Sequence, residues 1–185
     1  MEIIDEDVKD TMIEQTIEAS IDQQEEGDLS EGEVDLTDII ADIIVNTDTE
    51  TAEKIIDEVN DSDTDTNLSL KVISGISEKD SEVLNELSEN NKEQMEELTE
   101  DAIQNAENTS EDSQLIAQVV SVINDDLVNV MVEEVSKTSV DDKQTLSAKV
   151  LQAIVETEPD KMDIINDEIK DVMIEQAVEL SLIHI

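Results

Sequence analysis

The densest group of oxygen-bearing side chains lies at residues 61–68, which read Asp-Ser-Asp-Thr-Asp-Thr-Asn-Leu. Asp61, Asp63 and Asp65 alternate along this segment, and Asn67 follows at the same spacing. Calcium takes about six to eight oxygen ligands, and acids at alternate positions let one turn of the chain supply several of them. The pattern therefore predicts a metal site formed by Asp61, Asp63, Asp65 and Asn67.

The same segment resembles the first eight positions of a calcium-binding EF-hand loop, but it departs from that loop twice. Thr66 stands where the sharp turn needs glycine, and Val72 stands where the bidentate glutamate is required. The alternative is a solvated acidic loop that joins two helices, and the two departures favour it. Apart from weak, collective binding of Ca²⁺ by many carboxylates, we expect no cofactor.

The sequence shows no signature of catalysis. It contains no cysteine, and its one histidine is His184. Neither a glycine-rich phosphate loop nor a nucleophile elbow is present. Carboxylates are so frequent that no pair is distinctive as a general acid and base. We therefore predict a protein that is not an enzyme.

The charge limits the partners. Fifty-two Asp and Glu against ten basic residues give a net charge of −42 over 185 residues. Nucleic acid is excluded as a direct partner, because that binding rests on cations that neutralise phosphates. No apolar run approaches the ~20 residues that span a membrane. Repulsion between the like charges destabilises a folded state, and salt weakens this repulsion. A high net charge is also typical of disordered chains. Disorder is therefore the alternative to a fold, and the helical periodicity of the apolar residues argues against it.

Apolar residues recur at helical spacing in short segments about sixteen residues apart. The chain has no aromatic residue, so any core must be aliphatic with methionine. The β-branched runs 39–44 and 118–123 suit strands by propensity, but they lack alternation, so helices are favoured. The predicted helices are 2–20, 37–46, 51–59, 67–76, 81–88, 92–106, 113–123, 126–136, 143–156 and 161–179.

Three joints carry a hydroxyl residue followed three positions later by an acid, before an apolar run. They begin at Ser77, Ser139 and Thr157. We expect each hydroxyl to cap the helix that follows. The single proline, Pro159, is expected in the first turn of the last helix, where its missing N–H group costs little.

Residues 1–18 recur at 162–179, with 10 of 18 positions identical at a constant offset of 161. In the first copy we expect Ile4, Val8, Met12 or Ile13, and Ile17 to form one buried stripe. From these patterns we predict three parts of the chain. Residues 1–20 form a helix that ends one repeat unit, residues 21–35 form an acidic linker with two glycines, and residues 36–179 form a helical-repeat domain.

The last residues, 180–185, resemble the translation of a transposon-derived adapter used in DNA sequencing libraries. The repeat also breaks at this point, so we expect a non-biological tail there, with an ordinary apolar helix end as the alternative. Met1 aligns with Met162, which lies inside the chain. Met1 is therefore equally consistent with being an internal residue of a longer protein and with being the true first residue.

One helix and a turn per ~16 residues make a two-helix unit of ~32 residues, the size of helical hairpins that stack into solenoids. We predict an all-α fold of short amphipathic helices stacked in an irregular, solenoid-like array, with a compact helical bundle as the alternative. Residues 52–59 and 81–87 resemble the helical repeats of magnesium-transporter regulatory domains and flagellar motor switch proteins. The resemblance implies short amphipathic helices and no function.

These observations predict a non-catalytic acidic module of a longer repetitive protein, used as a spacer, scaffold or adhesive stalk. Its partners would be neighbouring repeats of the same chain or another protein, and divalent cations. Repetition, the absence of cysteine and the charge favour a secreted or cell-surface bacterial protein. The alternatives are a cytoplasmic module whose groove binds a basic partner, and a domain that responds to Ca²⁺ or Mg²⁺.

Overall fold

The computed structural model describes residues 6–26, 35–62, 67–106, 110–137, 144–157 and 159–183. All regular structure in these ranges is helical, which confirms the predicted all-α class. The first β-branched run lies in α2, and residues 118–122 of the second lie in α7, so both are helical and not strands. The elements are α1 (Glu6–Glu26), α2 (Leu36–Val45), α3 (Thr49–Asp61), α4 (Leu68–Lys79), α5 (Ser81–Asn90), α6 (Lys92–Gln104), α7 (Ser110–Val122), α8 (Asp125–Lys137), α9 (Gln144–Thr157), a 3₁₀ turn (Pro159–Asp163) and α10 (Asp167–Ile183).

Aspartates cap several of the helices. The side chains of Asp35, Asp48 and Asp80 accept hydrogen bonds from the backbone N–H groups of α2, α3 and α5 at 2.9, 3.0 and 3.0 Å. Each satisfies a donor that a helix start leaves without a partner in the helix. The prediction that Ser77 caps α5 is wrong. Ser77 lies inside α4 and donates to the Ser74 carbonyl at 2.8 Å, because α4 continues to the residue before Asp80.

Two other predicted boundaries differ from the structure or lie outside it. Helix α1 continues through Glu26, so residues 21–26 of the predicted linker are helical. Pro159 opens a separate 3₁₀ turn, and α10 begins only at Asp167. The proposed caps at Ser139 and Thr157 lie outside the described side chains.

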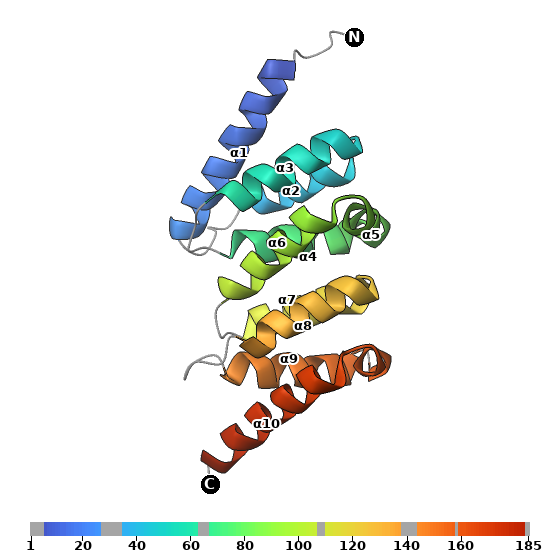
Figure 1. Ribbon diagram of the computed structural model, residues 1–185. Helices are drawn as coiled ribbons and strands as arrows, with labels where there is room; N and C mark the ends of the chain where they lie inside the picture. Colours follow the sequence, from blue (N-terminus) through green and yellow to red (C-terminus); the bar gives the residue numbers. More distant parts are fainter. Residues whose placement is uncertain are drawn as a thin grey trace.

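The helices are arranged in two layers (Figure 1). In one layer, α2, α4, α7 and α9 pack one upon the next, and in the other α3, α6 and α8 do the same. Helix α5 joins α4 to α6 and contacts both, which interrupts the regular alternation of the layers. Helix α1 packs mainly on α2, and α10 packs on α9 and α8, so the two copies of the repeated sequence lie at opposite ends of the stack.

One continuous aliphatic core runs between the layers, from Ile17 in α1 to Met173 in α10. Its residues follow the helical period, as Ala52, Ile55, Ile56 and Val59 of α3 do. Because no aromatic ring contributes, the stability of this core depends on many small aliphatic contacts. None of the described helices is long and apolar enough to cross a membrane.

Candidate functional site

The four residues of the predicted metal site are only partly described. Asp61 is the exposed last residue of α3, whereas Asp63 and Asp65 lie outside the described residues. Asn67 precedes α4, and its side-chain amide donates to the buried Asp112 of α7 at 3.2 Å, so it ties two helices together. Among the described residues, no three acidic or histidine side chains gather in a way that could hold a metal ion. The four-residue site stays a prediction.

Side-chain amides connect successive units of the stack. Asn60 of α3 donates to the Gln94 carbonyl of α6 at 3.1 Å, and Asn85 of α5 donates to the Val122 carbonyl of α7 at 3.2 Å. The donor and acceptor in these two pairs are 34 and 37 residues apart in the chain. Both separations exceed the predicted unit of ~32 residues.

Polar side chains from the next unit also cap the ends of helices near the last unit. Gln176 of α10 donates to the Ser136 carbonyl in the last turn of α8 at 3.1 Å. Lys161 reaches the Ile123 carbonyl just beyond α7 at 2.9 Å. Carbonyls at a helix C-terminus lack partners within the helix. Here a side chain from the next unit supplies the partner, so the end of one unit and the position of the next are coupled.

Asn129 of α8 makes the most complete connection of this kind. Its Nδ2 donates to the Asp125 carbonyl at 2.8 Å and contacts the Ile164 carbonyl at 3.5 Å. Its Oδ1 accepts from the Asn166 N–H at 3.1 Å. One side chain therefore holds the segment that leads into α10.

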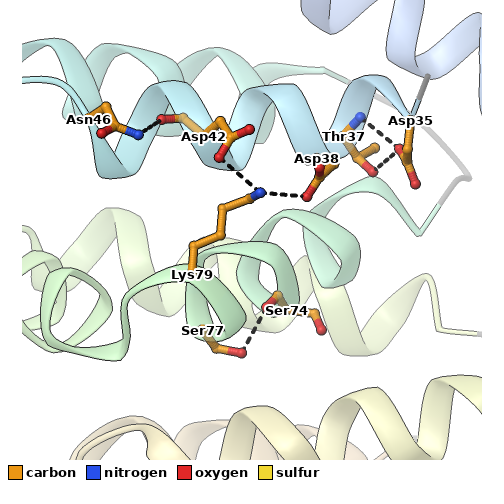
Figure 2. A network of polar contacts seen from close by, with 8 residues as sticks. All are labelled: Asp35, Thr37, Asp38, Asp42, Asn46, Ser74, Ser77 and Lys79. Carbon is orange, nitrogen blue, oxygen red and sulfur yellow. Dashed lines mark hydrogen bonds and ion pairs between the residues drawn. The ribbon is translucent and has the colours of Figure 1, made fainter.

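An ion-pair bridge joins α2 to α4 (Figure 2). Lys79 at the end of α4 extends towards α2 and pairs with Asp38 at 2.7 Å and Asp42 at 2.9 Å. Hydrogen bonds to the two carboxylates raise the pKa of the Lys79 ammonium. In a chain with few lysines, placing one against two acids relieves repulsion between neighbouring helices.

The two layers differ in charge. Helices α3 and α6 each carry five acids and one lysine, and α8 carries four acids and one lysine. In the other layer, α4 has one acid and two lysines, and α9 has one of each. Burial raises the pKa of the Asp101 carboxyl, and burial together with Asp61 and Glu53 raises the pKa of Asp57. The α3–α6–α8 layer is thus the acidic face of the stack.

A surface pocket of about 240 Å³ lies beside this face, between α5, α6 and α8. Lys92 lies at the pocket within 3.6 Å of Glu96 and 3.7 Å of Asp126. Asn124 donates to Ser88 across the same pocket. Its other lining residues are Glu89 and Leu127. The pocket offers three carboxylates, one side-chain amide, one hydroxyl and one ammonium group, a set suited to polar contacts and to cations.

The two copies of the repeated sequence are both helical, and they begin at equivalent positions, Glu6 and Asp167. Their buried residues nevertheless differ. Ile17 is 4% exposed, whereas its equivalent Val178 is 51% exposed. Conversely, Met12 is 55% exposed, whereas its equivalent Met173 is fully buried. In the first copy, Ile13 and Ile17 of the predicted stripe lie against the core, whereas Ile4 and Val8 lie outside the described side chains. At the equivalent positions of the second copy the stripe is buried only in part, because Ile165 and Met173 are buried but Val178 is exposed. Each copy buries the side that its own neighbours cover.

Sequence reasoning also missed the amide connections. Asn and Gln beside an apolar stripe are a detectable signal, since Asn is a poor helix former. The sequence cannot, however, say which carbonyl each amide reaches. Comparisons of the chain with protein-family models, with curated proteins and with solved structures found no match.

Proposed function

We propose that this chain is a non-catalytic, acidic helical-repeat module that serves as a spacer or scaffold within a longer repetitive protein, including as a surface stalk. The observation that carries the proposal is the way each unit holds the next. A continuous core runs through the stack, and amide contacts between residues 34 to 40 positions apart link successive units. Repeat proteins built from nearest-neighbour contacts of this kind form extended objects and gain length by adding units.

The charge is compatible with this role. An extended module must not aggregate, and a large net charge keeps chains apart in solution. The cost is self-repulsion within the fold, which salt reduces as the Debye length falls from about 8 Å to about 3 Å between 0.15 M and 1 M. We expect helicity to rise as NaCl increases from 10 mM to 1 M.

Small-angle X-ray scattering of the full chain tests the role as a spacer. A rigid stack gives a skewed pair-distance distribution with a long tail, unchanged between 0.15 M and 1 M NaCl once helicity has reached its plateau. A symmetric, bell-shaped distribution would contradict an extended module. A distribution that contracts strongly in salt would indicate a flexible chain instead of a spacer.

A second candidate function, the binding of a basic protein, is supported by the asymmetry of charge between the layers. The exposed acids of α3 and α6 include Asp57, Glu93 and Glu97. A lysine-rich peptide would be attracted to this face, and the attraction would weaken as salt rises.

Calorimetric titration with such a peptide at low salt tests the second candidate. Replacing Asp57, Glu93 and Glu97 with their amides should weaken binding by about threefold to 150-fold, since exposed ion pairs contribute about 0.2–1 kcal/mol each. A matched control replaces Glu78, Glu82 and Glu156, which are exposed and lie outside α3, α6 and α8. Equal losses in both triple variants would show attraction to net charge alone and would count against a defined binding face.

A further inference from the structure

The repeated helix carries two apolar faces, and each copy buries only one of them. In α10 the buried face is formed by Ile169, Met173 and Gln176, which lie against α8 and α9. In α1 the equivalent of Met173 is exposed, and the buried face instead contains Ile17 and Ser20, which lie on the side that packs against α2.

The two faces are nearly opposite. At 3.6 residues per turn, the centre of the Ile169–Met173–Gln176 face and the centre of the Ile174–Val178 face are about 150° apart around α10. Ile174 and Val178 are 46% and 51% exposed. Their equivalents in α1 are Ile13, which packs against the core, and Ile17, which is buried. The residues that are exposed on α10 therefore occupy the positions that are buried in α1, where α2 and α3 lie beside the helix.

We propose that the Ile174–Val178 face of α10 is a docking surface for the α2–α3 pair of a second copy of this chain, in the position that α1 occupies within one copy. The proposal deepens the proposed scaffold function and rests on it, because it names the contact by which units join end to end. Helix α10 then lies between α8–α9 of its own copy and α2–α3 of the next, with both apolar faces covered.

The fit is supported by sequence as well as burial. At the interface positions the two copies keep isoleucine at Ile13 and Ile174 and exchange one aliphatic residue for another at Ile17 and Val178. The contact is heterologous, since α10 of one copy meets α2–α3 of another, and such contacts build open chains of subunits. Because α1 already covers α2–α3 in each copy, α10 of the second copy must displace it, as in an exchange of equivalent helices.

The structure provides a matched control for a test of this surface. Val155 on α9 is 50% exposed, close to the exposure of Val178, but it lies on a different helix. Val178→Asp should block docking, whereas Val155→Asp should leave it unchanged. Both substitutions are at exposed positions, so neither removes a core contact, and circular dichroism checks that helicity is retained.

Weakening the helix that competes for the same site should have the opposite effect. Ile17→Asp loosens the hold of α1 on α2–α3 and leaves that pair open to α10 of another copy. Analytical ultracentrifugation in 1 M NaCl, where repulsion between copies is screened, measures the association of each variant.

We expect the Ile17→Asp chain to self-associate at least tenfold more strongly than the unaltered chain, since burying one aliphatic side chain is worth a factor of about ten or more. Adding Val178→Asp to it should return the chain to a monomer, and adding Val155→Asp should not. If the Ile17→Asp chain stays monomeric at every concentration, or if Val155→Asp and Val178→Asp reduce association equally, the docking proposal is overturned. An elongated scattering profile of the monomer would still support the spacer role, so the two proposals fail separately.

Discussion

Gly75 of α4 lies so close to Ala41 of α2 that a Cβ atom at position 75 would lie 2.8 Å from the Ala41 Cβ. Real Cβ atoms essentially never approach so closely. Ala41 is fully buried, and both residues are small, so the two helices pack closely at this point. The glycine sits inside a helix at a cost in helix propensity, and the close approach of α2 accounts for it.

Replacing Gly75 with alanine should therefore destabilise the protein. On an open helix surface the change would stabilise by about 0.5–1 kcal/mol through helix propensity. Here the added methyl group must push α2 and α4 apart, which costs about 1–3 kcal/mol as overpacking does. Urea denaturation measures the net loss. Replacing Ala41 with glycine in the Gly75→Ala chain should recover part of the lost stability, and a net gain from Gly75→Ala alone would contradict the packing argument.

Replacing Asn129 with alanine should lower the free energy of unfolding by about 1–2 kcal/mol, because the Asn166 N–H and the Ile164 carbonyl lose their side-chain partner. The better helix propensity of alanine offsets only a few tenths of this loss. Asn90 on α5, which is exposed, provides the control, and its replacement should have almost no effect. Hydrogen exchange should also quicken around residue 166 in the Asn129→Ala chain. Equal effects at the two positions would rule out a specific role for the link.

Acidification from neutral pH should at first stabilise the fold. The pKa values of Asp57 and Asp101 are raised in the folded state above 3.8, so the folded chain binds protons more readily than the unfolded chain. The gain accumulates as pH falls through the raised values towards 3.8. Asp167, whose pKa is lowered by its hydrogen bond with Lys170, acts in the opposite direction. Thermal unfolding between pH 7 and pH 4 measures the net effect of these groups on stability. A steady loss of stability over that range would contradict the predicted initial gain.

Asp101→Asn isolates the contribution of burial to this pH dependence. At pH 7 the free energy of unfolding of the variant should be higher than that of the parent by a few tenths of a kcal/mol, because the amide carries no charge to desolvate. On acidification the stability of the variant should rise less than that of the parent. Glu97→Gln on the same helix removes an exposed charge and corrects for the general loss of repulsion. The two variants should differ at pH 7 and converge towards pH 4.

The predicted metal site is open to a direct test on the full chain. Calorimetry with millimolar calcium should give a binding heat that falls when Asp61, Asp63 and Asp65 are all replaced with asparagine. A control with three acids replaced on α6, at Glu93, Glu97 and Glu100, should retain the heat. Loss of heat in both variants would indicate collective binding by the acidic surface. No heat in the parent chain would eliminate calcium as a ligand.

The parts of the fold that depend on local interactions could be predicted from the amino-acid sequence. The helical period predicted the helices, including α2 and α7 with their β-branched runs, because the alternation required for strands was missing. The absence of aromatic residues required an aliphatic core. These features follow from the residues of one segment, whose backbone and side-chain preferences act over a single helical turn.

Which face of the repeated helix is buried could not be predicted from the sequence, because it depends on the packing of neighbouring helices. Met12 and Met173 occupy equivalent positions in similar segments, yet one is exposed and the other buried. Burial depends on what lies beside a helix, and the neighbours of α1 and α10 are different helices. The same reason applies to the carbonyls that Asn60, Asn85 and Asn129 reach, and to the close packing of Gly75 on Ala41. Those contacts join residues tens of positions apart, and no local pattern contains their geometry.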